Sequence, residues 1–212
     1  MEKFKTFTLK TKIDNIKSKS NPAEKPKNIN SGWKDIVVKA PPMNSSDDVK
    51  TEMLVIKRET ESRTKEDDIS ILAHDEIATQ AIRNYLDKNN LSWDKDVVNK
   101  LTDVGGGVSR HFKNVFLRAR PAQLEEPLGI VINQSMDRDV DKKGTPSYPA
   151  GHSTQSRLVA EYYAKIYPEH KVGLINAAQE SGLSRIKAGW HYPSDHKAGI
   201  QLAKDILPLL EL

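Results

Sequence analysis

The chain has 212 residues, of which 37% are hydrophobic and 29% charged, and its formal net charge is +4. That length suits one compact domain with an appendage, and so small a basic excess makes nucleic acid an unlikely partner. Cysteine is absent, which excludes a disulfide framework, a thiolate metal site and a cysteine nucleophile.

Membrane and export signals are missing from the sequence. No stretch approaches the roughly 20 apolar residues of a membrane span, and the first 15 residues lack the apolar run of a signal peptide. The sequence therefore predicts a soluble, cytoplasmic protein without membrane insertion.

Residues 1–67 are predicted to be a partly flexible N-terminal extension. They are rich in lysine and are interrupted by four prolines, a composition typical of flexible segments. Two short apolar runs, Ile36–Val38 and Met53–Ile56, could form short strands or extended arms laid on a domain. A tail or an oligomer arm is favoured over a partner-docking tail, which leaves a homo-oligomer open.

The helical pattern begins at Ile69, where apolar residues recur near 3.6 spacing up to Asn89–Asn90. A second helical stretch starts at Trp93. The run Gly105–Gly107 is expected to break it, because each glycine costs a helix roughly 1 kcal/mol. A hinge or a close helix crossing explains these glycines better than a phosphate-binding nest, and another helix is expected over Val108–Arg118.

Residues 122–148 form the longest irregular region expected, which joins two of the motifs described below and should line or cover a pocket. Its charged run at 137–143 favours a solvated loop over a metal site, since the aspartate spacing fits no EF-hand. Further helices are expected over 153–167, 172–187 and 194–210. With no convincing strand after residue 68, the predicted fold is an all-α helical bundle over residues 68–212.

A histidine and an aspartate occur together near the C-terminal end. Pro193 suits the first turn of a helix, so we expect His191 just before that helix and Asp195 within its first turn. A carboxylate there can hold one imidazole nitrogen and leave the other as a nucleophile. His196, next along the chain, is expected at the surface.

Two earlier segments carry groups suited to an anion. Lys113 and Arg120 are seven residues apart, so on one helix they would share a face about 10 Å apart along the axis, with Arg118 pointing elsewhere. In Pro149–His152, a loop is expected to run into a helix capped by Ser153 or Thr154. Backbone N–H groups at such a helix start form an anion site.

Together the three segments resemble the phosphatidic-acid phosphatase type 2 (PAP2) superfamily, which includes class A acid phosphatases and vanadium haloperoxidases. The family signature is K-x6-R-P, then P-S-G-H, then S-R-x5-H-x3-D. It is matched by Lys113, Arg120 and Pro121, by Pro149, Gly151 and His152, and by Ser184, Arg185, His191 and Asp195. Ala150 replaces the motif serine, which removes one hydrogen bond worth roughly 0.5–1.5 kcal/mol; Ser153 could substitute for it.

The resemblance implies an all-α phosphatase that uses no metal and no cofactor, although vanadate or phosphate could occupy its site. His191 would attack phosphorus and form a phosphohistidine, Asp195 would orient His191, and His152 would protonate the leaving oxygen. Phosphate would be bound by Lys113, Arg120, Arg185, Gly151 and Ser184. Small soluble phosphates such as nucleotides are the expected substrates. A vanadium-dependent haloperoxidase and a non-catalytic phosphate- or nucleotide-binding protein are the alternatives.

Overall fold

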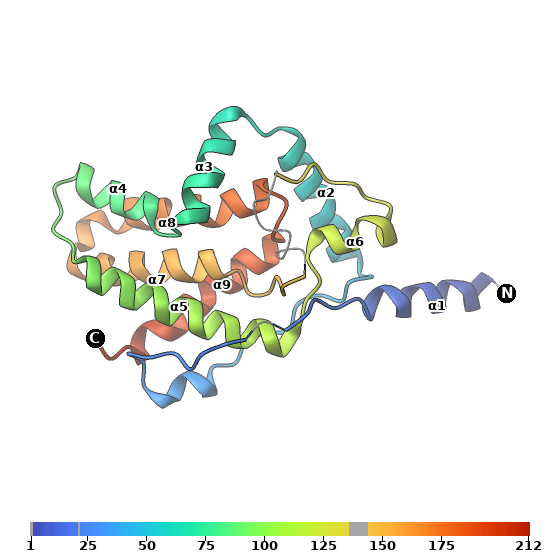
Figure 1. The fold of residues 1–212 in the computed structure, drawn as a ribbon, viewed down its shortest axis with the longest axis horizontal. Coiled ribbons are helices and arrows are strands. Elements are labelled where there is room, and N and C mark those ends of the chain that lie inside the picture. The colour runs from blue at the N-terminus through green and yellow to red at the C-terminus, as the bar shows by residue number, and fades with distance from the viewer. Residues whose placement is uncertain (1, 21, 136–143) are drawn as a thin grey trace.

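The computed structural model describes residues 2–20, 22–135 and 144–212, and helices dominate it (Figure 1). Over these residues there is no strand, only two isolated β-bridges, which confirms the all-α prediction. The α-helices are α1 (Glu2–Asp14), α2 (Asp47–Glu61), α3 (Lys65–Glu76), α4 (Gln80–Lys88), α5 (Lys95–Phe116), α6 (Pro121–Leu128), α7 (Gly151–Ile166), α8 (Lys171–Lys187) and α9 (Pro193–Ile206). Short 3-10 turns are η1 (Ser31–Asp35), η3 (Pro168–His170) and η4 (Leu207–Leu209).

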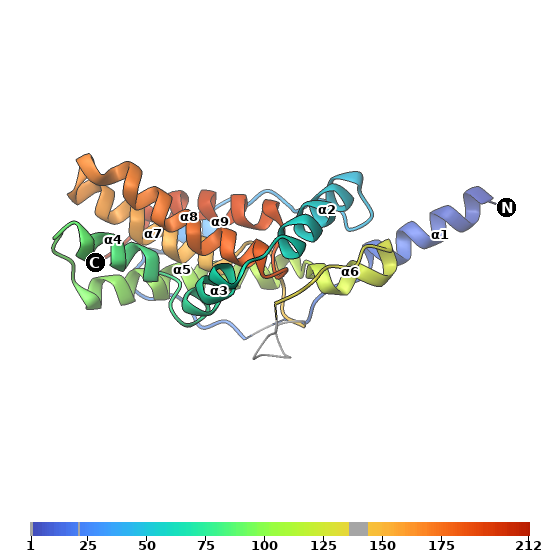
Figure 2. The same ribbon diagram turned by 90° about the horizontal axis from the view of Figure 1, so that it is seen from above.

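Helix α7 lies at the centre of the bundle, with α5, α8 and α9 packed around it (Figure 1, Figure 2). Its buried residues Leu158, Val159 and Tyr163 recur at helical spacing and belong to the main core. Ile166 of α7 and Leu183 of α8 are about half exposed and lie outside this core. In the described part of the chain, no helix combines the length and the apolarity needed to cross a membrane.

Helix α5 runs without interruption through its three glycines, so the predicted break is wrong. The close helix crossing is the correct explanation: a Cβ on Gly105 would lie 3.2 Å from the Cα of Gln155 on α7. A Cβ on Gly107 would lie 3.1 Å from the Cβ of Pro26. The tight packing outweighs the conformational cost of the glycines, and the separate helix expected over Val108–Arg118 is the last part of α5.

The chain turns sharply between α5 and α6. Leu117 adopts the left-handed conformation (φ 49°) and its N–H donates to the carbonyl of Lys113 at 2.9 Å. Arg120 then precedes α6, with Pro121 at the first helical position. Lys113 and Arg120 therefore do not share a helix. The prediction from their seven-residue spacing, that they lie on one helix face, is wrong. Helix α6 also corrects the expectation of an irregular region over 122–148, whose charged run at 137–143 lies outside the described residues.

The N-terminal extension contains more helix than its composition indicated. The run Met53–Ile56, predicted as a strand or arm, lies in α2, where Ser46 caps the helix and Val49, Met53 and Ile56 are fully buried. Leu54 and Val55 lie between Met53 and Ile56, and this continuous apolar run obscured the helical spacing. Ile36–Val38 follows η1 as extended chain without a strand partner.

The helix predicted to begin at Ile69 is two helices, α3 and α4, separated at residues 77–79. The predicted boundary between residues 67 and 68 falls inside α3. There, Thr64 and Asp67 form a reciprocal capping box, which explains why the helix begins before the apolar pattern does.

Candidate active site

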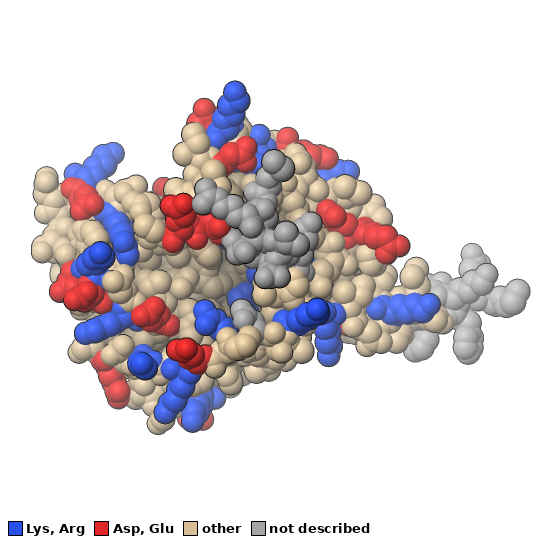
Figure 3. Space-filling view, viewed as in Figure 1, with Lys and Arg blue, Asp and Glu red and all other residues tan. Residues whose placement is uncertain are grey.

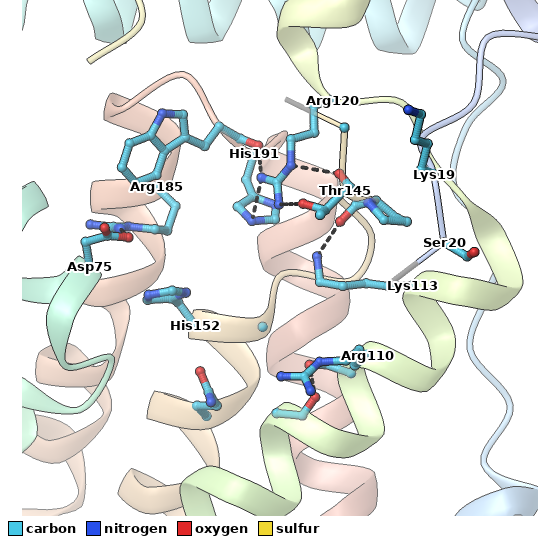
Figure 4. A pocket seen from close by; sticks show the side chains of 17 residues that line it. Lys19, Ser20, Asp75, Arg110, Lys113, Arg120, Thr145, His152, Arg185 and His191 are labelled. Atoms are coloured by element: carbon cyan, nitrogen blue, oxygen red, sulfur yellow. Dashed lines mark hydrogen bonds and ion pairs between the residues drawn. The ribbon is translucent and has the colours of Figure 1, made fainter. Parts of the chain in front are cut away.

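A pocket of about 890 Å³ opens where α5, α7 and α8 meet the segments that precede α6, α7 and α9 (Figure 4). Six of the eight predicted site residues line it: Lys113, Arg120, Gly151, His152, Arg185 and His191. Asp195 and Ser184 lie behind this lining and contact residues that belong to it. Three segments distant in sequence thus converge on one cavity.

His191 is held from behind by a chain of buried charges. Its Nδ1 lies 3.0 Å from Oδ2 of Asp195, a carboxylate with no exposed surface. The other oxygen of Asp195 accepts a hydrogen bond of 2.6 Å from Nη1 of Arg118, and Arg118 also pairs with Glu52 at 3.0 Å. The Tyr192 N–H donates to Asp195 as well, at 3.0 Å. The prediction that Pro193 begins a helix with Asp195 in its first turn is confirmed.

The electrostatics of this chain leave His191 neutral and Asp195 ionised. Burial lowers the pKa of His191 well below its ordinary value, and the nearby Arg120 lowers it further. Burial alone would raise the pKa of Asp195, but Arg118 and the hydrogen bond from His191 hold it below its usual range. Nδ1–H therefore donates to Asp195, and Nε2 keeps its lone pair.

Arg120 lies against the free edge of the His191 ring, with Nη1 3.4 Å from Nε2. Backbone carbonyls fix the guanidinium: Nη1 donates to Trp190 at 2.8 Å and Nε donates to Thr145 at 2.9 Å. Lys113 is held similarly, since its Nζ donates to the carbonyl of Pro146 at 2.7 Å. These backbone contacts hold both cations in fixed positions in the pocket wall.

Burial lowers the pKa of Lys113 well below its ordinary value, and Arg120 and Arg110 add to the effect. Asp195 acts in the opposite direction. The positive charge of this part of the site is therefore partly desolvated before any ligand enters, which strengthens its attraction for an anion.

Arg185 is fixed from three sides. Its Nη1 pairs with Asp75 at 3.1 Å, its Nη2 donates to the carbonyl of Ile71, and its guanidinium lies 4.8 Å from the ring centre of Trp190. Nε donates to the hydroxyl of Ser184 at 3.1 Å. Ser184 was predicted to bind phosphate; in this structure its hydroxyl supports Arg185 from outside the pocket lining.

Helix α7 begins at the pocket, with Gly151 and His152 in its first turn. Ala150 occupies the N-cap position and no side chain caps the helix, so the predicted capping by Ser153 or Thr154 is wrong. Ser153 is buried and its hydroxyl lies 2.8 Å from Nδ1 of His196, away from the pocket. Ser153 therefore does not substitute for the motif serine, and the prediction that His196 lies at the surface is also wrong.

Sequence reasoning missed several residues around the site. Arg118 was expected to point elsewhere; it stays out of the pocket lining but binds Asp195, and no local pattern indicates this contact. Lys19 and Asp75 line the pocket from the N-terminal part of the chain. Arg110, three residues before Lys113, could have been found, because that spacing places both on one helix face.

Metal ligands are not gathered in the described residues: no group of three or more histidine, aspartate or glutamate side chains could hold an ion there. The aspartates at 137–143, considered above as metal ligands, lie outside the described residues. The donors that surround the pocket are cations and imidazoles, which suit an anion.

A pocket lined by cations and two histidines, within a helical bundle, is the arrangement that the sequence motifs predicted. Residues 101–204 match the family model of the PAP2 superfamily, and this part of the chain belongs to that superfamily. The matched range contains every residue of the three motifs.

Curated relatives carry the same type of domain. The chain is 30% identical over 102 residues to a non-specific acid phosphatase of Providencia stuartii, which is 48% of this chain and 39% of that protein. It is 37% identical over 93 residues to an acid phosphatase of Zymomonas mobilis, 43% of this chain and 33% of that protein. A lipid A 1-phosphatase of Rhizobium etli is 39% identical over 54 residues, 26% of this chain and 23% of that protein. The chain thus spans less than two fifths of the length of these relatives.

A solved structure shows the same fold. The transmembrane PAP2 type phosphatidylglycerolphosphate phosphatase from Bacillus subtilis superposes with a TM-score of 0.52 at 15% identity, covering 77% of this chain and 85% of that one. At this identity the similarity concerns the fold alone.

Proposed function

We propose that this protein is a phosphatase that hydrolyses phosphate esters, with His191 as the nucleophile. The observation that carries the proposal is the geometry of one imidazole: Nδ1 is bound to Asp195, while Nε2 faces the pocket 3.4 Å from Arg120. The acid phosphatases among the relatives support the same reaction class.

The proposed reaction begins with neutralisation of the phosphate. A phosphoryl group carries negative charge that repels a nucleophile, and Lys113, Arg120 and Arg185 line the pocket in which it would bind. Cations fixed before the substrate arrives supply much of the catalytic effect in phosphoryl transfer. Because three side chains supply this charge, the proposed mechanism has no metal step.

The chemical steps follow from the positions of the two histidines. The Nε2 lone pair of His191 attacks phosphorus, a P–N bond forms, and the P–O bond to the leaving group breaks. His152 protonates the leaving oxygen, then takes a proton from water as that water attacks phosphorus, and the P–N bond breaks to release phosphate. Asp195 stabilises the positive charge that His191 carries in the intermediate.

The proposed substrates are small, water-soluble phosphates such as nucleotides. A pocket of about 890 Å³ is near the upper end of the range for small-molecule sites, so it suits a ligand larger than phosphate itself. The similarity to the lipid A 1-phosphatase covers only 54 residues, which is a weak argument for a lipid substrate.

Hydrolysis of p-nitrophenyl phosphate in the presence of EDTA tests this proposal. We expect His191→Ala to lower kcat by about 10³-fold or more, and His152→Ala to lower it by about 10²–10⁴-fold while slowing the breakdown of a trapped phosphoenzyme. His111→Ala, an exposed histidine of α5 outside the pocket lining, is the matched control. Undiminished hydrolysis by His191→Ala protein would rule out the assigned nucleophile, and activity that EDTA abolishes would rule out the metal-free mechanism.

A further inference from the structure

Two cations outside the PAP2 motifs line the same pocket. Lys19 comes from the segment after α1, and Arg110 comes from α5. In Figure 4 both lie on the side of the pocket where Lys113 is found, and Arg185 lies on the other side. The pocket therefore carries more positive charge than one phosphate group requires.

Lys19 is placed at the pocket by hydrogen bonds of its own backbone N–H and of the preceding residue. The Ser18 N–H donates to the carbonyl of Leu117 at 3.0 Å, and the Ser18 hydroxyl donates to the carbonyl of Arg118 at 3.1 Å. The N–H of Lys19 itself donates to the carbonyl of Gly144 at 2.7 Å. Although its side chain is exposed, its Cα is tied to two segments that form the site.

Arg110 is fixed relative to the catalytic cations by its helix. It lies three residues before Lys113, so the two side chains are neighbours on one face of α5. It is also among the groups that lower the pKa of Lys113, which is consistent with a short distance between the two charges. Within the described ranges, neither Arg110 nor Lys19 is ion-paired to a carboxylate.

The opposite side of the pocket contains a carboxylate. There Asp75 pairs with Arg185 at 3.1 Å and itself lines the pocket, so it offsets part of the positive charge. In the space-filling view, a group of acidic side chains lies just above the central hollow, whereas side chains of both charges lie below it (Figure 3). A substrate with two anionic groups would therefore enter in one orientation, with its second group directed away from Asp75.

We propose that Lys19 and Arg110 form a second phosphate subsite, so that the preferred substrates carry two phosphate groups. This inference rests on the proposed function: one phosphate lies against His191 while the other is bound by these two side chains. The volume of about 890 Å³ accommodates such a molecule. Both cations are exposed, so their attraction for the second phosphate weakens as salt increases.

The test compares kcat/KM for adenosine 5′-phosphate and adenosine 3′,5′-bisphosphate at a fixed ionic strength of about 0.1 M. These two substrates differ only in the second phosphate. Adenosine 5′-diphosphate serves as a third substrate, in which the second phosphate is joined to the first through an anhydride bond. We expect the wild-type protein to prefer a diphosphorylated substrate. The double variant Lys19→Gln/Arg110→Gln should lower kcat/KM about tenfold more for that substrate than for the monophosphate, because one exposed charge pair changes an equilibrium by up to about fivefold.

The double variant Lys88→Gln/Lys100→Gln is the control, since it removes the same charge from exposed positions outside the pocket lining. An equal loss on mono- and diphosphorylated substrates, or a loss no larger than that of the control, would overturn the second subsite. If no substrate is hydrolysed, the proposed function fails. Calorimetric titration with the same nucleotides then tests the second subsite by binding affinity alone. The subsite is refuted if the double variant binds diphosphorylated nucleotides with the same preference as the wild type.

Discussion

At the scale of single residues, Arg118 supports the site without lining the pocket. Its guanidinium is almost fully buried between Asp195 at 2.6 Å and Glu52 at 3.0 Å, and it lies 3.9 Å from the ring centre of Tyr192. Arg118 is the largest of the contributions that hold the pKa of the buried Asp195 below its ordinary value, so it helps to keep this carboxylate ionised in the interior. The orientation of His191 therefore depends on a residue in another helix connection, whereas its neutral state results from burial and from Arg120.

Replacing Arg118 should cost stability as well as activity. We expect Arg118→Met to lower the free energy of unfolding by about 3–5 kcal/mol in urea titrations at pH 7, because it leaves the buried Asp195 without its cationic partner. The exposed pair of Lys50 and Asp47 supplies the control, and Lys50→Met should change stability by less than about 1 kcal/mol.

The pH dependence of stability gives an independent measurement of the same contact. The folded pKa of Asp195 lies below its ordinary value of about 3.9, so its ionised form contributes stability above about pH 4 that is lost as the pH falls further. In Arg118→Met this pKa rises, and the loss between about pH 5 and pH 3 should be smaller than in the wild type. Identical slopes in the two proteins would show that Arg118 does not set the charge of Asp195.

Local spacing predicted the contact between His191 and Asp195, because Pro193 fixes the start of a helix and both residues lie within one turn of it. The contacts of Asp195 with Arg118 and of Arg185 with Asp75 join residues 77 and 110 positions apart in the chain. No local periodicity encodes such separations, since they result from tertiary packing. The sequence could therefore predict which motif side chains line the pocket, but not which other side chains hold them in position.

At the scale of helices, small residues decide how closely the bundle can pack. A Cβ on Gly199 of α9 would lie 2.6 Å from the carbonyl oxygen of Ala150 and 2.9 Å from the Cβ of Ser153, at the start of α7. Helix propensity treats a glycine such as Gly105 as a break. In this bundle the same residue type marks a crossing, and only the position of the facing helix distinguishes the two.

Alanine substitutions at two helical glycines should separate packing from propensity. We expect Gly199→Ala to lower the free energy of unfolding by about 1–3 kcal/mol, since backbone at the start of α7 must shift. At Gly106 the added Cβ meets only the end of the Gln155 side chain, at 2.9 Å. Because a flexible side chain can move and alanine favours a helix by about 1 kcal/mol, Gly106→Ala should stay within about 1 kcal/mol of wild type. Thermal unfolding monitored by circular dichroism measures the stability of both variants. Equal losses would contradict the conclusion that close packing requires a glycine at position 199 but not at position 106.

At the scale of the whole molecule, the N-terminal part of the chain contributes to the core and to the site. Helix α2 packs Val49, Met53 and Ile56 into a cluster with Ile186 and Tyr192, which lie within the third motif. In the main core, Trp33 of η1 is buried together with residues of α5 and α7.

A chain containing only residues 68–212 is therefore expected to fold poorly by itself. Each fully buried apolar side chain of α2 contributes about 1.5–3 kcal/mol, so losing three of them removes about 5–9 kcal/mol from a typical total of 5–15 kcal/mol. Residues 68–212 alone should show no cooperative urea transition, and full-length Met53→Ala should lose about 2–5 kcal/mol. Leu54→Ala, at a position 57% exposed on the same helix, is the control and should change little. A cooperative transition of wild-type midpoint in residues 68–212 would instead show that the segment before them is accessory, and the interior would then have to be stabilised by α5, α7, α8 and α9 alone.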